Sequence, residues 1–170
     1  MKQKWIKETM PYIVIIVVVV LIRSFIVTPI RVDGSSMYST LSNDEILLLE
    51  KYDKNYERFD IVVFKNGKEK LIKRIIGLPG EVVEYKENKL YINDKYYEEP
   101  FLKNNQITYD FKLKNIDIDY KIIPEDYYFV LGDNRTNSTD SRMLGLIHKS
   151  IIQGKANFAI FPFDKFGKIN

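Results

Sequence analysis

The sequence contains no cysteine and a single histidine, and these two scarcities exclude several kinds of chemistry. Without thiols the protein has no disulfide, no thiol nucleophile and no cysteine-based metal site. With His148 alone, a multi-histidine metal site is excluded too, and a histidine-dependent triad would have to use that residue. We therefore expect neither a metal nor any other cofactor.

The net charge is also small, at +3 for 170 residues. No basic patch is interleaved with aromatic residues in a binding pattern, so we expect no nucleic-acid partner. Apolar residues make up an ordinary 45% of the chain and the charges are mixed, which excludes a disordered protein. The length fits one domain with room for a small subdomain.

One long apolar run is present, from Met10 to Val27, with Arg23 as its charged interruption. About 18 residues at a rise of roughly 1.5 Å each are just enough to cross a bilayer. The basic residues before the run predict a cytoplasmic N-terminus. A cleaved signal peptide is the alternative, but bulky residues stand where small ones would mark a cleavage site. The predicted parts are a cytoplasmic segment, a transmembrane anchor and an extracytoplasmic domain, at 1–9, 10–28 and 29–170.

Beyond Pro29, which ends the helical pattern, the sequence is typical of a mainly β domain. Short runs of β-branched and aromatic residues alternate with turn residues, and Asn66-Gly67 predicts a hairpin. The expected strands are Ile46–Glu50, Ile61–Phe64, Leu71–Ile76, Val82–Tyr85, Lys89–Ile92, Ile107–Leu113 and Tyr127–Leu131. The polar stretch 87–120 is either a small β insertion or a surface meander of the same domain.

Three stretches are candidates for chemistry. The hydroxyl-rich octet 34–41 offers a nucleophile, Ser36, beside apolar residues, although a polar linker leaving a membrane helix would look similar. In a strand, Lys73 shares a face with Leu71 and Ile75. Burial among apolar neighbours lowers a lysine pKa toward the range of a general base, whereas an edge-strand lysine would keep its amine in water.

The third stretch, 132–142, follows an apolar strand and is dense in polar side chains. Such residues fix loops and form ion pairs, so Asp140 and Arg142 are candidates to pair, and Ser138 is a candidate to orient an amine. An elaborate surface turn is the alternative. Because a serine hydroxyl needs a base and no acidic partner is evident for His148, a pair of serine and lysine is the more economical arrangement.

Together these stretches resemble the bacterial type I signal peptidases, the membrane-anchored Ser-Lys proteases that remove secretory signal peptides. The short chain with one anchor is similar to the Gram-positive members. The segments that carry the resemblance are Ser36–Leu41, Asp60–Phe64, Lys73–Gly80, Leu90–Asn93 with Glu99-Pro100, and Gly132–Arg135 with Ser138, Asp140–Arg142 and Gly145.

The resemblance implies a role for each matching residue. Ser36 would be the nucleophile and Lys73 the general base. Ser138 would orient the lysine amine, and Asp140 and Arg142 would hold the site together. The residues that would help to line shallow substrate pockets are Val32, Met37 and Ile72.

The resemblance also implies the fold, the partners and the location. The fold would be a signal-peptidase-like β catalytic domain behind one transmembrane helix, with an apolar surface on membrane lipid. The substrates would be secretory preproteins with small residues at positions −1 and −3 of the cleavage site.

Two departures from the family pattern concern the nucleophile loop. Ser39 replaces a proline, and Gly34 stands where some members have a serine that completes the oxyanion hole. Two other functions remain open: a catalytically silent, membrane-anchored β module for surface-protein assembly, and a protease of the same family dedicated to one substrate.

Overall fold

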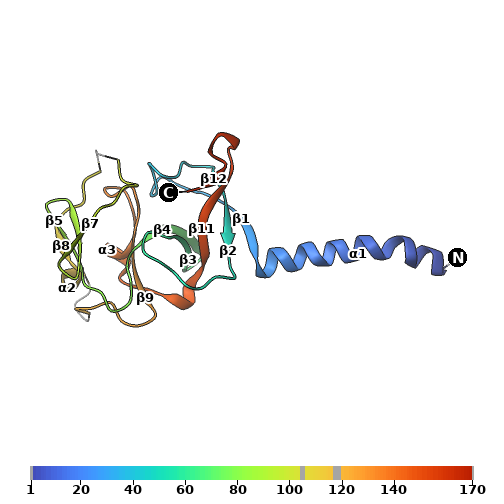
Figure 1. Cartoon of the computed structure of the whole chain (residues 1–170), viewed down its shortest axis with the longest axis horizontal. Coiled ribbons are helices and arrows are strands. Elements are labelled where there is room, and N and C mark those ends of the chain that lie inside the picture. The colour runs from blue at the N-terminus through green and yellow to red at the C-terminus, as the bar shows by residue number, and fades with distance from the viewer. Residues whose placement is uncertain (1, 104–105, 117–119, 170) are drawn as a thin grey trace.

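A long N-terminal helix precedes a β-rich body in the computed structural model, which describes residues 2–103, 106–116 and 120–169 (Figure 1). The α-helices are α1 (Lys2–Phe25), α2 (Leu113–Ile116) and α3 (Ser141–Leu144), and the 3-10 helices are η1 (Lys149–Ile151) and η2 (Phe163–Lys165). The strands are β1 (Val27–Arg31), β2 (Ile46–Glu50), β3 (Ile61–Asn66), β4 (Glu69–Gly77), β5 (Val83–Lys86), β6 (Lys89–Ile92), β7 (Lys95–Tyr97), β8 (Phe111–Lys112), β9 (Tyr127–Leu131), β10 (Ile147–His148), β11 (Ile152–Phe161) and β12 (Gly167–Lys168).

The larger sheet has eight strands, with β1-β2-β11-β3-β4-β9-β10 in spatial order and β12 paired to β11. All its pairings are antiparallel, which confirms the mainly β prediction. Pro29 lies in the edge strand β1, where a residue without an N–H is tolerated. The predicted hairpin at Asn66-Gly67 joins β3 to β4, with Asn66 opposite Glu69.

A second antiparallel sheet of four strands has the order β7-β6-β5-β8. It lies at the opposite end of the body from α1 (Figure 1). Its strands begin at Val83, ahead of the polar stretch 87–120, and residues 104–105 and 117–119 of that stretch lie outside the described residues.

The predicted strand Ile107–Leu113 is mostly wrong, since only β8 forms there and α2 follows it. Side-chain hydrogen bonds take the place of a strand ladder in the first half of this stretch. The Thr108 N–H donates to the side-chain oxygen of Asn88, and Asp110 accepts from the N–H of Glu87. Side chains thus bond backbone groups in both directions between this stretch and the tip of the β5–β6 hairpin, where a strand would have used backbone pairs.

The strand β11 was not predicted, although it is central to the larger sheet between β2 and β3. Its sequence mixes Gly154, Lys155 and Asn157 with apolar residues and does not alternate. Register shifts along both of its neighbours explain this pattern, because each irregularity reverses which face a side chain points to. Gly154 is required where β11 passes β2, since an added Cβ would lie 2.0 Å from the carbonyl oxygen of Glu50.

Three groups of buried apolar residues form the core. The first joins the loop after β1 to the larger sheet, through Val32, Met37 and Leu41. The second lies between the small sheet and β9, and the third involves β3, β4, β9 and β11. The loop that carries the candidate nucleophile is therefore part of the core and is not a linker leaving a membrane helix.

The helix α1 projects from the body beside β1 and β2 (Figure 1). Its side chains are described from Thr9 onward, and those from Met10 to Phe25 include a continuous run of exposed apolar groups. Within the described part of the chain, no helix combines the length and the apolar character needed to cross a membrane.

A buried arginine connects the small sheet to the loop after β9. The Arg135 guanidinium donates to Tyr85 Oη at 2.8 Å and Thr108 Oγ1 at 2.9 Å, and it pairs with the Glu99 carboxylate. Its Nε also donates to the Gly132 carbonyl, in the loop that approaches Ser36. The position of that loop depends on an ion pair whose arginine is fully buried.

We expect Arg135→Met to lower the free energy of unfolding by about 3 to 5 kcal/mol, because it leaves the Glu99 carboxylate buried without its partner. The matched control is Arg31→Met, whose partner Asp44 is 58% exposed, and which should cost no more than about 1 kcal/mol. Urea denaturation of the full chain in detergent, followed by circular dichroism, measures both. Equal losses for the two variants would contradict this account.

Candidate active site

Ser36 lies in the loop after β1 and is held there from both sides. Its neighbour Met37 is buried in the core, and the Met37 carbonyl accepts hydrogen bonds from the N–H groups of Thr40 and Leu41, which close the loop. From the other side, the Asn134 N–H donates to the Ser36 carbonyl at 3.0 Å. The apolar residues Met37 and Leu41 thus attach the octet 34–41 to the core, whereas Ser36 is only half-buried.

Lys73 lies on β4, opposite Val62 of β3, and is only 1% exposed. Its Nζ donates to the Ile72 carbonyl at 2.8 Å and lies 2.7 Å from Ser36 Oγ. The predicted lysine is therefore a buried group in direct contact with the predicted nucleophile. A solvated edge-strand lysine, the other interpretation of the sequence, is excluded.

Burial lowers the pKa of the Lys73 amine from 10.5 to about 8. Desolvation is the main cause, because an ammonium loses its hydration among the surrounding side chains. The carboxylates of Asp140 and Asp133 act in the opposite direction, but desolvation outweighs them. Near neutral pH a useful fraction of this amine is unprotonated and able to accept a proton.

Asp133 neutralises the guanidinium of Arg74, the residue that follows Lys73 on β4. Its carboxylate pairs with Arg74 at 2.7 Å, with both side chains nearly inaccessible to water, and accepts a hydrogen bond from Thr40 Oγ1. Arg74 also donates to the Phe59 carbonyl. One buried carboxylate thereby joins the nucleophile loop, the lysine strand and the loop after β9.

Asp140 and Arg142 form the predicted pair, with two contacts of 2.8 Å between carboxylate and guanidinium. The same carboxylate caps α3 through the Arg142 N–H and accepts from the Gly132 N–H at 3.0 Å. Asp140 therefore fixes the beginning and the end of the loop 132–142.

Ser138 lies beside Gly132, where a Cβ added to the glycine would meet Ser138 Oγ at 2.2 Å and the Ser36 carbonyl oxygen at 2.5 Å. Glycine is required here because two segments approach its backbone closely. The Ser138 hydroxyl is buried and has no hydrogen-bond partner among the described residues. The expected hydrogen bond to the lysine amine is thus not present, although Ser138 lies beside Gly132, next to the loop that carries Ser36.

The three pocket candidates share one apolar cluster beneath the nucleophile loop. Val32 and Met37 are 3% and 1% exposed, and Ile72 is half-buried and packs against them. Ile72 therefore offers more surface to a substrate than the other two.

His148 is remote from this chemistry. Its Nδ1 lies 2.7 Å from Ser150 Oγ, its ring packs on Tyr127, and it has no contact with Ser36. Among the described residues, no group of three or more histidines and carboxylates is arranged to hold a metal ion.

A β-rich fold with a buried lysine amine against a serine hydroxyl is compatible with one class of protein, the hydrolases with a Ser-Lys variant of the catalytic triad. Comparison with known proteins gives the family. A family model described as "Signal peptidase, peptidase S26" matches residues 3–161. The chain belongs to this family of serine endopeptidases.

Individual relatives agree with this assignment. The chain is 44% identical to signal peptidase I S of Bacillus subtilis strain 168, over 99% of this chain and 96% of that protein. It is 37% identical to signal peptidase IB of Staphylococcus aureus strain Mu50, over 98% and 94% of the two chains. A crystal structure of a signal peptidase I from Enterococcus faecalis V583 is similar with a TM-score of 0.54 and 38% identity, covering 59% of this chain and 96% of that one.

Sequence reasoning missed two residues that assemble the site, Arg74 and Asp133. Each lies next to a predicted group, within a segment already singled out, but neither was assigned a role. The sequence signals were an arginine inside one apolar strand and an aspartate two residues after the end of another apolar strand. Buried charges of this kind require partners.

We expect Lys73→Met to unfold less readily than the natural protein at pH 7, by about 1 to 3 kcal/mol. A pKa lowered from 10.5 to about 8 corresponds to about 3 kcal/mol, and the lost hydrogen bonds offset part of the gain. Between pH 8 and 10.5 the unfolded chain binds more protons at this lysine than the folded protein does. The natural protein therefore gains stability with rising pH, and the difference shrinks.

Urea denaturation at pH 7 and pH 10 measures this difference. Lys89→Met removes an exposed lysine of β6 and serves as the control, for which no such pH-dependent gain is expected. A Lys73→Met protein that is less stable than the natural one at pH 7 would show that the lysine contributes more by its contacts than its burial costs.

Proposed function

We propose that this protein removes N-terminal signal peptides from exported preproteins, with Ser36 as the nucleophile and Lys73 as the general base. The observation that carries the proposal is the 2.7 Å contact between Ser36 Oγ and the Lys73 amine, whose pKa is lowered to about 8. The family and the names of its relatives support the substrate class.

The proposed reaction begins with unprotonated Lys73. As Ser36 Oγ attacks the carbonyl carbon of the scissile peptide bond, its proton moves to the lysine amine. The resulting ammonium gives a proton to the leaving nitrogen, the C–N bond breaks, and an ester to Ser36 remains. A water molecule, deprotonated by the same amine, then hydrolyses the ester and restores the serine.

The oxyanion formed in these steps needs hydrogen-bond donors. The backbone N–H of Ser36 donates to no acceptor among the described residues and is our candidate for the first donor. Gly34 has no side chain to supply a second. Ser138, with its unpartnered hydroxyl, is our candidate to accept a hydrogen bond from the ammonium once Lys73 is protonated.

We further propose that α1 anchors the protein in the membrane from Met10 onward, with the N-terminus cytoplasmic and the body outside. The sequence extends this anchor to residue 28, but Val27 and Thr28 belong to β1 and pair with Glu50 and Leu49, so the proposed span ends at Phe25. The exposed apolar side chains of α1 support the anchor, because on a helix that projects from the body they have no protein surface to pack against (Figure 1). Such an anchor would hold the active site near the membrane, where signal peptides are inserted.

We expect the cleavage rate to rise with pH around a midpoint near 8, since only the unprotonated amine accepts the serine proton. Ser36→Ala and Lys73→Arg should each reduce cleavage to below about one thousandth, because the first lacks the nucleophile and the second cannot lose its proton in this range. Full-length protein in detergent, a labelled preprotein and gel analysis from pH 6 to 10 provide the measurement.

His148→Ala is the matched control and should stay within about threefold of the natural protein, as its ring contacts Ser150 and Tyr127 and not the candidate site. If His148→Ala is inactive while Lys73→Arg turns over normally, the assignment of the base is wrong. If all four proteins leave the preprotein uncut with native circular dichroism, the chain is the silent β module considered above.

Substrate preference is expected to favour small residues, because Val32 and Met37 are buried and only Ile72 of the three pocket candidates offers surface to a substrate. A preprotein with alanine at positions −1 and −3 should be cut, and replacing the −1 alanine by leucine should slow cleavage about a hundredfold or more, because a branched side chain would displace the scissile bond from Ser36. Competition between the two preproteins in one tube gives the ratio directly. Equal cleavage would refute a pocket restricted to small residues.

A further inference from the structure

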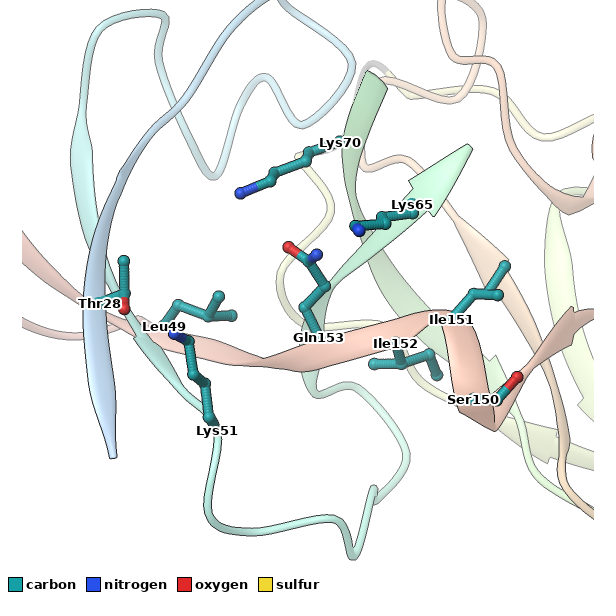
Figure 2. Close-up of a pocket in the computed structure, with 9 residues that line it drawn as sticks. All are labelled: Thr28, Leu49, Lys51, Lys65, Lys70, Ser150, Ile151, Ile152 and Gln153. Atoms are coloured by element: carbon teal, nitrogen blue, oxygen red, sulfur yellow. The ribbon is translucent and has the colours of Figure 1, made fainter. Parts of the chain in front are cut away.

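A second feature lies apart from Ser36, on the side of the body next to α1. It is a cleft of about 440 Å³ between the ends of β1 and β2, the β3–β4 hairpin and the start of β11 (Figure 2). Three of its lining side chains are lysines and none is acidic. The lysines are Lys51, Lys65 and Lys70.

Lys65 and Lys70 face one another directly across the β3–β4 hairpin. Like charges in this arrangement repel, and neither amine has an ion-pair partner among the described residues. Figure 2 shows both side chains reaching toward the same space as the Gln153 amide. An anion between the two amines would remove the repulsion and gain a further donor from the glutamine.

Lys51 connects the cleft to the end of α1. Its Nζ donates to the Arg23 carbonyl at 3.0 Å and the Ser24 carbonyl at 3.3 Å, and Thr28 Oγ1 also donates to the Arg23 carbonyl at 2.7 Å. Thr28 and Lys51 both line the cleft. Two residues that line the cleft therefore also contact the end of the apolar helix α1.

The remaining lining residues are Ser150 and three apolar residues, Leu49, Ile151 and Ile152. Leu49 and Ile152 are buried, so the apolar surface that the cleft exposes comes from Ile151, which is 39% exposed. A free inorganic anion would match the lysines but leave this apolar surface in water. A phospholipid carries both a phosphate and an apolar portion next to it, so it matches both kinds of wall.

We propose that this cleft binds the phosphate headgroup of an anionic membrane phospholipid, between Lys65 and Lys70. The proposal rests on the membrane anchoring proposed above, which would bring the bilayer surface to the end of α1. Binding there would fix the rotation of the body about the helix axis, because the cleft lies to one side of α1. That rotation determines where Ser36 faces relative to the bilayer.

Native mass spectrometry of the full chain, released from detergent micelles containing equal amounts of phosphatidylglycerol and phosphatidylcholine, tests the proposal. We expect the natural protein to retain phosphatidylglycerol with about tenfold preference. The double variant Lys65→Gln/Lys70→Gln should lose this preference. The matched control is Lys86→Gln/Lys89→Gln, which removes another pair of lysines facing each other across a hairpin and should keep it.

Two results would overturn the proposal: an unchanged preference in Lys65→Gln/Lys70→Gln, or an equal loss in the control variant. Complete displacement of phosphatidylglycerol by 10 mM inorganic phosphate would also overturn it, by making the cleft a site for free phosphate. Cleavage of a preprotein in lipid-free detergent, measured on the same samples, separates the two proposals. If Lys65→Gln/Lys70→Gln loses the lipid preference but still cleaves, the result supports the cleft proposal and leaves the proposed function intact. If the natural protein shows the lipid preference but cleaves nothing, the proposed function is wrong and the cleft proposal stands.

Discussion

The burial of one amine is the constraint on which the rest of this site depends. Lys73 is placed in the middle of a sheet, where water cannot stabilise its ammonium, and its pKa falls to about 8 as a result. The same burial brings Nζ within 2.7 Å of Ser36 Oγ. Under the proposed mechanism, stability and reactivity are therefore opposed at this residue, because the desolvation that lowers the pKa of its amine is a cost to folding.

The charges around Lys73 are arranged so that they do not restore its pKa to the ordinary value. Two carboxylates lie close enough to raise the lysine pKa, yet each is paired with an arginine: Asp133 with Arg74 and Asp140 with Arg142. These pairs also connect the three segments of the site, since Asp133 reaches the nucleophile loop through Thr40 and Asp140 holds the backbone of Gly132. Electrostatic neutralisation and loop positioning are thus performed by the same side chains. Arg135 extends the network to the small sheet.

The opposite end of the larger sheet, where β1 and β2 meet the end of α1, would lie next to the bilayer if α1 is the anchor. The carbonyls at the end of α1 are bound by Thr28 and Lys51, so the helix is attached to the body through hydrogen bonds as well as through the chain. Beside this junction lies the lysine-lined cleft. A helix that leaves a domain at one point restricts its distance from a bilayer but leaves it free to rotate. A contact to one side of the helix removes that freedom, which is why the location of the cleft matters for where the active site faces.

The sequence by itself determined the β-rich character and the hairpin at Asn66-Gly67, because these follow from local preference. It also led to the proposal of Ser36 and Lys73 as the reactive pair, from the lack of cysteine, the single histidine and the resemblance of their motifs to a known family. The pairing of Asp140 with Arg142, two residues apart, was also predicted from the sequence, but only the tertiary structure decided which charges meet between distant segments. The pairing of Arg74 with Asp133, the unpartnered hydroxyl of Ser138 and the course of β11 all depend on contacts between segments far apart in the chain. Burial and register are properties of the assembled sheet, and no local pattern encodes them.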